Sequence, residues 1–228
     1  GLVLPSMRAC SSGTTAVGGM EKCICWPDGK KGKAPIIRVP GRAKLRRMRE
    51  LIIGGARSGK SVLAERRASE SGLRVIYVAT ALALDAEMSR RIEQHRVRRC
   101  PEWGLVVEPL ELAATLHRYA APEVCLLVDC LTLWLSNLLF AGEAANQAEA
   151  GEAVHCQRLA GATQALVDRL PKLPGRVILV SNEVGCGIVP TTPMSRLFAD
   201  EHGRLNQRVA AVCERVTLVA AGLPLTLK

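Results

Sequence analysis

The chain has 228 residues, 48% of them apolar, which is enough for one α/β domain with a substantial core. Aromatic residues make up only 3%, so aliphatic side chains must build that core. The formal net charge is +10, but residues 1–49 hold eleven Lys/Arg and two Asp/Glu, and residues 50–228 hold twenty and nineteen. The folded part is therefore close to neutral, and charge gives no support for a nucleic-acid-binding face on it.

Residues 1–47 differ in composition from the rest of the chain. They are rich in Gly, Ser, Pro, Lys and Arg and show no sustained apolar periodicity, which predicts a disordered basic arm. Met48 stands just before the first predicted strand, so the arm could equally be a spurious upstream extension. A third interpretation is a basic arm that binds a membrane or a nucleic acid. The folded domain is expected to span residues 48–228.

The most informative stretch is a glycine-rich loop between a predicted strand and a predicted helix. An apolar run ends at Gly54, four residues follow, and Gly59-Lys60-Ser61 opens a helical segment, which is the phosphate-binding loop pattern. In such a loop main-chain N–H groups surround a phosphate, the lysine reaches the β- and γ-phosphates, and the hydroxyl binds Mg²⁺. The alternative is a glycine turn beside a surface lysine. The predicted nucleotide-binding loop consists of Gly54, Gly55, Ala56, Arg57, Ser58, Gly59, Lys60 and Ser61.

Strands and helices are predicted to alternate from residue 50 onward. Short apolar runs rich in Val, Ile and Leu predict strands at 51–53, 74–79, 105–107, 124–128, 176–180 and 216–219. Helical segments are predicted at 60–71, 85–99, 110–120, 131–140, 143–170 and 193–214. The alternation predicts an α/β fold, with a mostly parallel sheet flanked by helices, of the P-loop NTPase (RecA-like) kind. Residues 216–228 predict an antiparallel edge at the C-terminus.

Two features bear on the compartment of the protein. Its nine cysteines are an odd number without framework spacing, which predicts reduced thiols in the cytoplasm. The near-apolar stretch 124–142 approaches the length of a membrane span, but Asp129, Ser136 and Asn137 interrupt it. A buried strand followed by a helix explains this stretch better, so no membrane span is predicted.

Acidic residues follow two of the predicted strands. Ligands bind at the carboxyl ends of strands in sheets of this kind, so the residues that end each strand matter most. Asp129 comes directly after an apolar strand and is predicted to hold Mg²⁺ together with Ser61. Glu183 lies two residues beyond its strand and could do similar work. For both acids the alternative is a helix N-cap or a solvated turn.

The predicted helix 85–99 carries His95 on a partly apolar face. A lone histidine in such a place is more often packed or on the surface than catalytic. The arginines around it form a solvated face or, next to a triphosphate, an anion clamp. The Gly- and Pro-containing loop at 182–193 is expected to cover a site. Arg204, Asn206 and Gln207 are expected to lie on an exposed polar face of the last predicted helix.

Several motifs occur in the order in which a known family has them. They are Gly-Gly-Ala-Arg-Ser-Gly-Lys-Ser at 54–61, Tyr-Val-Ala-Thr-Ala at 77–81, Arg-Ile-Glu-Gln-His-Arg at 91–96, Val-Asp-Cys-Leu-Thr at 128–132, Ser-Asn-Glu-Val-Gly-Cys-Gly-Ile-Val-Pro at 181–190 and Gly-Arg-Leu-Asn-Gln-Arg at 203–208. On these motifs the chain resembles the bifunctional adenosylcobinamide kinase/adenosylcobinamide-phosphate guanylyltransferase family of cobalamin biosynthesis. The phosphate-binding loop alone is shared with many families, whereas the ordered set is far more specific.

The resemblance implies two reactions. In the first, adenosylcobinamide is phosphorylated with ATP or GTP. In the second, GMP passes from GTP to adenosylcobinamide phosphate, giving adenosylcobinamide-GDP and pyrophosphate. In this family the second reaction proceeds through a GMP–histidine intermediate, and the matching histidine is His95. The resemblance therefore assigns a catalytic role that periodicity alone does not, and a neutral imidazole is a reasonable nucleophile at phosphorus.

The resemblance also implies further site residues and a homo-oligomer, with a trimer as the known form. Lys60 is the second expected catalytic residue, and Mg²⁺ is expected with the nucleotide. Segment 1–47 departs from the family pattern, and Asp129 stands where some relatives carry Glu. Alternatives are a small-molecule kinase, which needs no His95, and a regulatory nucleotide-binding module without turnover. Nucleotide contacts beyond the loop are expected at Ala79, Thr80, Ala81, Arg96, Val97, Arg98, Arg99, Glu108 and Asp129.

Overall fold

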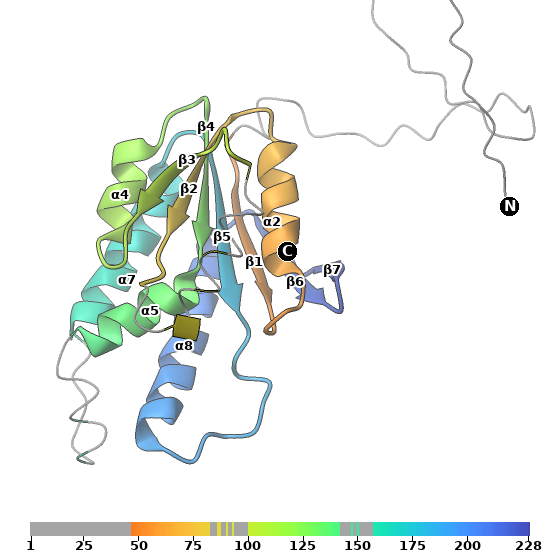
Figure 1. Cartoon of the computed structure of the whole chain (residues 1–228). Helices are drawn as coiled ribbons and strands as arrows, with labels where there is room; N and C mark the ends of the chain where they lie inside the picture. Colours follow the sequence, from red (N-terminus) through yellow and green to blue (C-terminus); the bar gives the residue numbers. More distant parts are fainter. Residues whose placement is uncertain are drawn as a thin grey trace, which may run out of the picture. The chain divides into compact units, whose positions relative to one another are not determined.

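The computed structural model describes residues 47–82, 86, 87, 90, 93, 100–141, 147, 150 and 157–228 (Figure 1). Residues 1–46 of the predicted arm lie outside this set. So do most of the predicted helix at 85–99 and most of the first part of the predicted helix at 143–170.

In the described part of the chain, seven strands form one sheet (Figure 1). Their order is β3-β2-β4-β5-β1-β6-β7, and all neighbours are parallel except β6 and β7. The mostly parallel sheet and the antiparallel C-terminal edge are thus confirmed. The strands are β1 Arg49–Gly54, β2 Arg74–Ala79, β3 Gly104–Val107, β4 Val124–Asp129, β5 Arg176–Asn182, β6 Arg215–Ala220 and β7 Leu223–Thr226.

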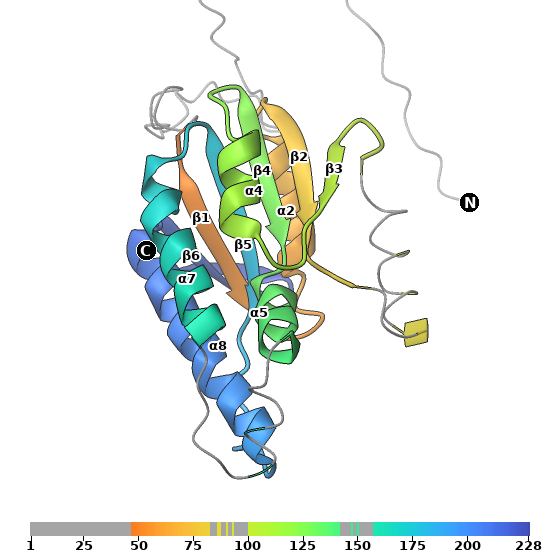
Figure 2. The same cartoon turned by 90° about the vertical axis from the view of Figure 1, so that its left-hand side faces the viewer.

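Helices cover both faces of the sheet (Figures 1 and 2). Helix α2 packs on one face, and α4, α5, α7 and α8 pack on the other. A short 3₁₀ helix, η1, follows α7 and leads into β5. The helix bounds are α2 Lys60–Ser69, α4 Leu112–Tyr119, α5 Leu131–Phe140, α7 Gln157–Arg169, η1 Leu170–Lys172 and α8 Pro193–Val212.

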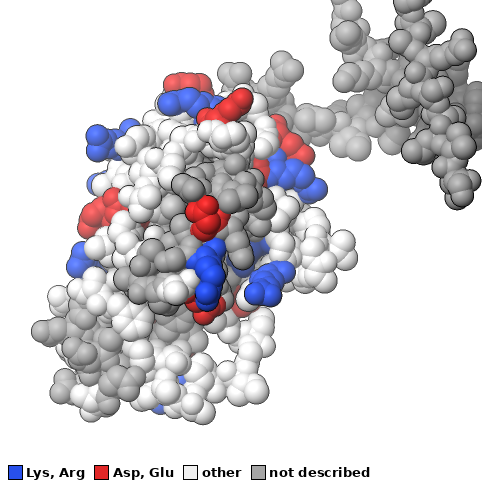
Figure 3. Space-filling model, viewed as in Figure 1, with Lys and Arg blue, Asp and Glu red and all other residues white. Residues whose placement is uncertain are grey.

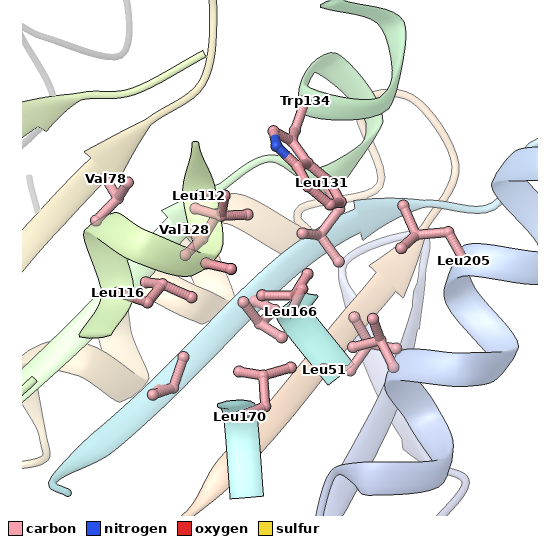
Figure 4. Close-up of a cluster of buried hydrophobic side chains, with 14 of the residues drawn as sticks. Leu51, Val78, Leu112, Leu116, Val128, Leu131, Trp134, Leu166, Leu170 and Leu205 are labelled. Atoms are coloured by element: carbon pink, nitrogen blue, oxygen red, sulfur yellow. The ribbon is translucent and has the colours of Figure 1, made fainter. Parts of the chain in front are cut away.

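The core is built from side chains that alternate between the two faces of the central strands. In β1, Leu51 and Ile53 belong to the larger apolar cluster, whereas Ile52 belongs to the cluster beneath α2. Figure 4 shows the larger cluster, in which leucines from the helices meet Leu51, Val78 and Val128 of the sheet. Strands covered on both faces explain why the sequence shows continuous apolar runs rather than a polar–apolar alternation.

The surface of the described residues carries charges of both signs. On the face in Figure 3, basic and acidic side chains are interspersed, as the nearly neutral charge of residues 50–228 predicts. The near-apolar stretch 124–142 is divided between β4 and α5. Among the residues that the structure describes, no helix has the length and apolar character needed to cross a membrane.

Charged side chains are buried at the amino end of β1. The Glu50 carboxylate, fully buried, pairs with Arg176 at 3.0 Å between Oε2 and the guanidinium nitrogen, and it also pairs with Arg67. The buried Arg49 guanidinium donates to the main-chain carbonyls of Leu170 at 2.7 Å and Gly175 at 3.3 Å. Because a buried charge without a partner is costly, these contacts fix where β1 begins between β5 and β6.

Replacing Glu50 by Gln should therefore lower the free energy of unfolding by about 3–5 kcal/mol, since two guanidinium groups would lose their buried counter-charge. Urea denaturation followed by circular dichroism measures this change. The matched control is Glu70→Gln, whose exposed pair with Arg66 spans 3.9 Å and should contribute less than about 1 kcal/mol. Equal effects of the two substitutions would contradict the prediction.

Candidate nucleotide-binding site

The strand, glycine-rich loop and helix predicted from the sequence are present. β1 ends at Gly54 and α2 begins at Lys60, with Gly59 at the N-cap in a left-handed conformation (φ 95°). The main-chain N–H of Ser58 donates to the Gly55 carbonyl at 3.3 Å, which closes a turn inside the loop. The loop therefore leads into the amino end of a helix, where free N–H groups and the helix dipole favour an anion.

Gly54 and Ser58 show that the loop is built around main-chain atoms. A Cβ on Gly54 would lie 2.4 Å from the carbonyl oxygen of Val219 and 2.7 Å from Ser58 Oγ, so only glycine fits. Ser58 Oγ is buried and has no hydrogen-bond partner among the described residues. A buried hydroxyl without a partner is costly, and an oxygen of a bound phosphate would satisfy it. The loop thus fits a phosphate-bearing ligand.

Lys60 lies beside this loop, within range of the charge of Asp129. Lys60 is buried, and its Nζ donates to the Gly55 carbonyl at 3.1 Å. Burial lowers the pKa of Lys60, while the nearby Cys130 thiol and Asp129 carboxylate act in the opposite direction. The Tyr77 hydroxyl donates to Asp129 Oδ2 at 2.9 Å and fixes the carboxylate, and burial followed by the Asp129 charge raises the pKa of Tyr77.

Ser61 and Asp129 are the predicted Mg²⁺ ligands, and both are half-buried. Within the described residues there is no group of three or more His, Cys, Asp or Glu side chains that could hold a metal. Mg²⁺ in nucleotide sites takes only one or two protein oxygens, with phosphate oxygens and water completing its shell. One hydroxyl at the start of α2 and one oriented carboxylate at the end of β4 fit that chemistry.

Two other predicted contacts are held by the protein itself. The buried Thr80 hydroxyl donates to the Cys130 carbonyl at 2.7 Å and accepts from the Cys130 N–H at 2.9 Å, joining the ends of β2 and β4. Glu108 accepts from the N–H groups of Leu110 and Glu111 at 2.9 and 2.8 Å and so fixes the turn that leads into α4. A nucleotide contact of either side chain stays a prediction.

Of the remaining predicted residues, the structure describes Glu183, Ala79 and Ala81 but not the segment around His95. Glu183 Oε1 accepts from the Gly185 N–H at 3.1 Å within a turn, and a role of this acid toward Mg²⁺ stays a prediction. Ala79 and Ala81 are half-buried beside Thr80. Outside the described residues lie His95, Arg96, Val97, Arg98 and Arg99.

A buried polar network lies between α5, β5 and α8, and the sequence did not predict it. His202 Nε2 is 3.0 Å from Thr132 Oγ1 and 3.3 Å from Ser181 Oγ, and its Nδ1 is 3.4 Å from Asn206 Nδ2. The Asn206 amide also accepts from the Ser181 hydroxyl at 2.7 Å and donates to the Asn182 carbonyl at 2.9 Å. A neutral ring protonated on Nε2 satisfies all these contacts, whereas a second ring proton would face the Asn206 NH₂ group. Burial accordingly lowers the pKa of His202 to about 4.

The expectation for Asn206 was therefore wrong, although Arg204 and Gln207 are exposed as predicted. Asn206 is only 7% exposed. The available signal was helical spacing, because Asn206 shares a face of α8 with His202 and Val209, both buried.

An apolar pocket of about 310 Å³ opens at the same edge of the sheet as the loop. It lies between the end of α5, the β5–α8 connection and the start of α8. Ile188 and Val189 in that connection are 98% and 74% exposed. The lining residues are Phe140, Val184, Pro190, Met194, Ser195, Phe198 and Ala199.

Comparison with known proteins assigns the chain to a family. A family model described as cobinamide kinase / cobinamide phosphate guanyltransferase matches residues 50–227. The bifunctional adenosylcobalamin biosynthesis protein CobP of Pseudomonas aeruginosa is 56% identical over 181 residues, covering 79% of this chain and 98% of that protein. The proteins named CobU from Escherichia coli K12 and Salmonella typhimurium LT2 are 38% and 37% identical, each covering 78% of this chain and 98% of the relative.

This chain belongs to the cobinamide kinase / cobinamide phosphate guanyltransferase family. It is accordingly an enzyme with these two activities, and the predicted resemblance is confirmed. The P-loop fold is also confirmed, with β5 inserted between the loop strand β1 and the Asp129 strand β4 in the RecA-like manner. Similar solved structures include the type III secretion ATPase EscN of enteropathogenic E. coli (14% identity, 78% of this chain, 43% of that chain, TM-score 0.49).

Gly54→Ala should destabilise this family member by about 1–3 kcal/mol and weaken GTP binding, because the new Cβ must displace the Val219 carbonyl or the Ser58 side chain. The matched control is Gly55→Ala, where a Cβ meets no atom within 4 Å and stability should change by less than about 0.5 kcal/mol. Urea denaturation and calorimetric titration with GTP measure both quantities. Similar stabilities for the two variants would count against the tight contact.

His202 should make stability depend on pH. Its folded-state pKa of about 4 lies below the ordinary value of 6.5, so between these pH values the unfolded chain binds more protons. Stabilisation is complete above about pH 6.5 and is lost as the pH falls toward 4. His202→Gln should therefore flatten the fall in melting temperature across this window. The exposed His117 supplies the control, and His117→Gln should keep the wild-type slope.

Proposed function

We propose that this chain phosphorylates adenosylcobinamide with ATP or GTP and then transfers GMP from GTP to the product. The products of the second reaction are adenosylcobinamide-GDP and pyrophosphate. The observation that carries this proposal is a phosphate-binding loop in which buried Lys60 donates to the Gly55 carbonyl, in a chain whose family model spans residues 50–227.

In the kinase step the chain's own residues hold and neutralise the triphosphate. The loop N–H groups and Lys60 would bind the β- and γ-phosphates, and the charge of Lys60 would stabilise the transferring phosphoryl group. Ser61 and Asp129 would hold Mg²⁺, which when bound supplies further neutralisation of phosphate charge. Tyr77 keeps the Asp129 carboxylate in one orientation through its hydrogen bond of 2.9 Å.

In the second step His95 would act as the nucleophile. Its imidazole nitrogen attacks the α-phosphorus of GTP, and the bond from that phosphorus to the leaving pyrophosphate breaks. An oxygen of adenosylcobinamide phosphate then displaces the imidazole and takes the GMP group. Support comes from the Arg-Ile-Glu-Gln-His-Arg motif at 91–96 and from the identity with CobP. The nucleotide contacts proposed beyond the loop are Ala79, Thr80, Ala81, Arg96, Val97, Arg98, Arg99, Glu108 and Asp129.

Several properties of the whole protein belong to the same proposal. The apolar pocket beside the β5–α8 connection supports a second substrate with a large apolar surface, as a corrin ring has. The described cysteines Cys100, Cys125, Cys130, Cys186 and Cys213 are free, which supports a reducing cytoplasm. We further propose a homo-oligomer, with a trimer as the form suggested by family resemblance. Residues 1–47 are proposed to be dispensable for both activities.

Single substitutions should separate the kinase step from the guanylyl-transfer step. With GTP labelled at the α-phosphate, the wild-type protein should acquire a covalent label that is labile in acid and stable in base, as a phosphorus–nitrogen bond is. His95→Ala should lose this label and guanylyl transfer while keeping much of the kinase rate. Lys60→Ala should lose both activities by more than about 100-fold, since it removes a charge from the transferring phosphate.

Mass spectrometry of the adduct and separate assays with adenosylcobinamide and its phosphate measure these outcomes. Labelling of His95→Ala at the wild-type rate would place the nucleophile elsewhere. A wild-type protein that phosphorylates adenosylcobinamide but takes up no label would be a plain kinase, and one that binds GTP without either reaction would be a regulatory module.

A further inference from the structure

The turn between β6 and β7 lies against the phosphate-binding loop. β6 is the neighbour of β1 in the sheet, and β7 forms the outer edge beyond it (Figure 1). The main-chain N–H of Gly222 in this turn donates to the Ser58 carbonyl at 2.9 Å. A Cβ on Gly59 would lie 3.4 Å from the Gly222 Cα, so the two main chains are in close contact. The turn therefore touches the loop just before α2 begins.

This turn has a backbone conformation that most residues avoid. Ala220 pairs with Leu223 across the hairpin, so only Ala221 and Gly222 connect the two strands. Their φ angles are 51° and 80°, both in the left-handed region, as in a type I′ turn. Glycine adopts such an angle without a steric penalty, whereas alanine is strained there. Because the donor N–H belongs to Gly222, this conformation determines where that N–H points.

The strand β7 buries little apolar surface. All four of its residues are exposed, including Leu223 at 72%. The end of the hairpin is tied to α8, since Lys228 Nζ donates to the carbonyls of Ala210 and Ala211 at 3.2 and 3.1 Å. The contact between the hairpin and the loop is therefore separable from the packing of the core, and its loss can be measured in a folded protein.

The contact fixes the orientation of one peptide group in the loop. A trans peptide is planar, and its C=O and N–H point in opposite directions. The Ser58 carbonyl points to Gly222, so the N–H of the same peptide, which belongs to Gly59, points away from the hairpin. Gly59 is the N-cap of α2, and N–H groups at such a helix end are the ones that hold a phosphate. Holding the carbonyl therefore preorganises a phosphate donor.

We propose that the Ala221–Gly222 turn is a positioning element of the nucleotide site, in which the Gly222 N–H aims the Gly59 N–H at the bound phosphates. This inference rests on the proposed nucleotide-binding function of the loop. The turn makes no bond to the ligand in this role. It keeps the loop in its binding conformation before the nucleotide arrives, so that binding does not have to order the loop.

The test compares two glycines with the same backbone constraint. Gly222→Ala places a methyl group where no described atom lies within 4 Å, so its effect comes from the φ angle of 80°. Gly72, just beyond the end of α2, has a φ angle of 64° and equally open described surroundings, and Gly72→Ala is the matched control. The ligands are the α,β-methylene analogues of GTP and GDP with Mg²⁺, which resist attack at the α-phosphorus and report binding alone. In calorimetric titration, Gly222→Ala should weaken both affinities by about tenfold, and Gly72→Ala should change them by less than about twofold.

Gly222→Asn tests whether the backbone conformation is the cause. Asparagine adopts a positive φ more readily than alanine and keeps the N–H, so this variant should bind both analogues within about threefold of the wild-type affinity. Melting temperatures of Gly222→Ala and Gly72→Ala should fall by similar amounts. With adenosylcobinamide, the KM for the nucleotide should rise in Gly222→Ala while the KM for adenosylcobinamide stays unchanged.

Equal losses of affinity in Gly222→Ala and Gly72→Ala would show a general effect of lower stability and would overturn the inference. So would an unchanged affinity in Gly222→Ala, or a Gly222→Asn variant as weak as Gly222→Ala. If the wild-type protein shows the expected differences but does not phosphorylate adenosylcobinamide, the proposed function fails and the role of the turn stands. If it phosphorylates adenosylcobinamide and Gly222→Ala binds like the wild type, the proposed function stands and the inference fails.

Discussion

The structure depends on the close approach of main chains at Gly54, where the sheet leaves no room for a side chain. The Val219 carbonyl of β6 lies 2.4 Å from the position that a Cβ would occupy. The Gly54 carbonyl accepts from the N–H of Glu183 at 3.1 Å, and the Ser58 carbonyl accepts from the N–H of Gly222 at 2.9 Å. The loop is thereby tied to the end of β5 on one side and to the β6–β7 turn on the other. Its shape is set by three strands that meet around it, which preorganises its N–H groups for a phosphate.

Polar groups are buried at both ends of the central strands, and the two sets have different consequences. At the amino edge, Glu50 is enclosed by Arg67 and Arg176, and the charges neutralise one another. At the carboxyl edge the neutral network around His202 satisfies its own members and fixes the ends of β5 and α5. The first arrangement stabilises the sheet alone. The second lies on the α8 face of the sheet, so it does not occupy Lys60 or Asp129, which are available to a ligand on the α2 face.

Much of the fold was predictable because its signals are local. Apolar runs gave the strands, and glycines with a following lysine and serine gave the loop, since each pattern needs only neighbours in sequence. The side chains of Thr80 and Glu108 show where such reasoning ends. Both are expected nucleotide contacts, and only the structure shows that their side chains also hydrogen-bond to Cys130 and to the turn before α4. Asn206 was wrongly expected to be exposed because its partners, Ser181 and Asn182, belong to a strand more than twenty residues earlier in the chain.

The α/β class, the phosphate-binding loop and, through ordered motifs, the family can all be read from the amino-acid sequence. Each of these follows from residue types at fixed spacing along one stretch of chain. The position of β5 between β1 and β4, which brings Asn182 opposite Gly54 and just beyond Asp129, is visible only in the folded sheet. The burial of His202, which favours its neutral form, is likewise visible only in the folded structure. Strand order and burial arise from packing between distant segments, and a site made where several strands end takes its geometry from that packing.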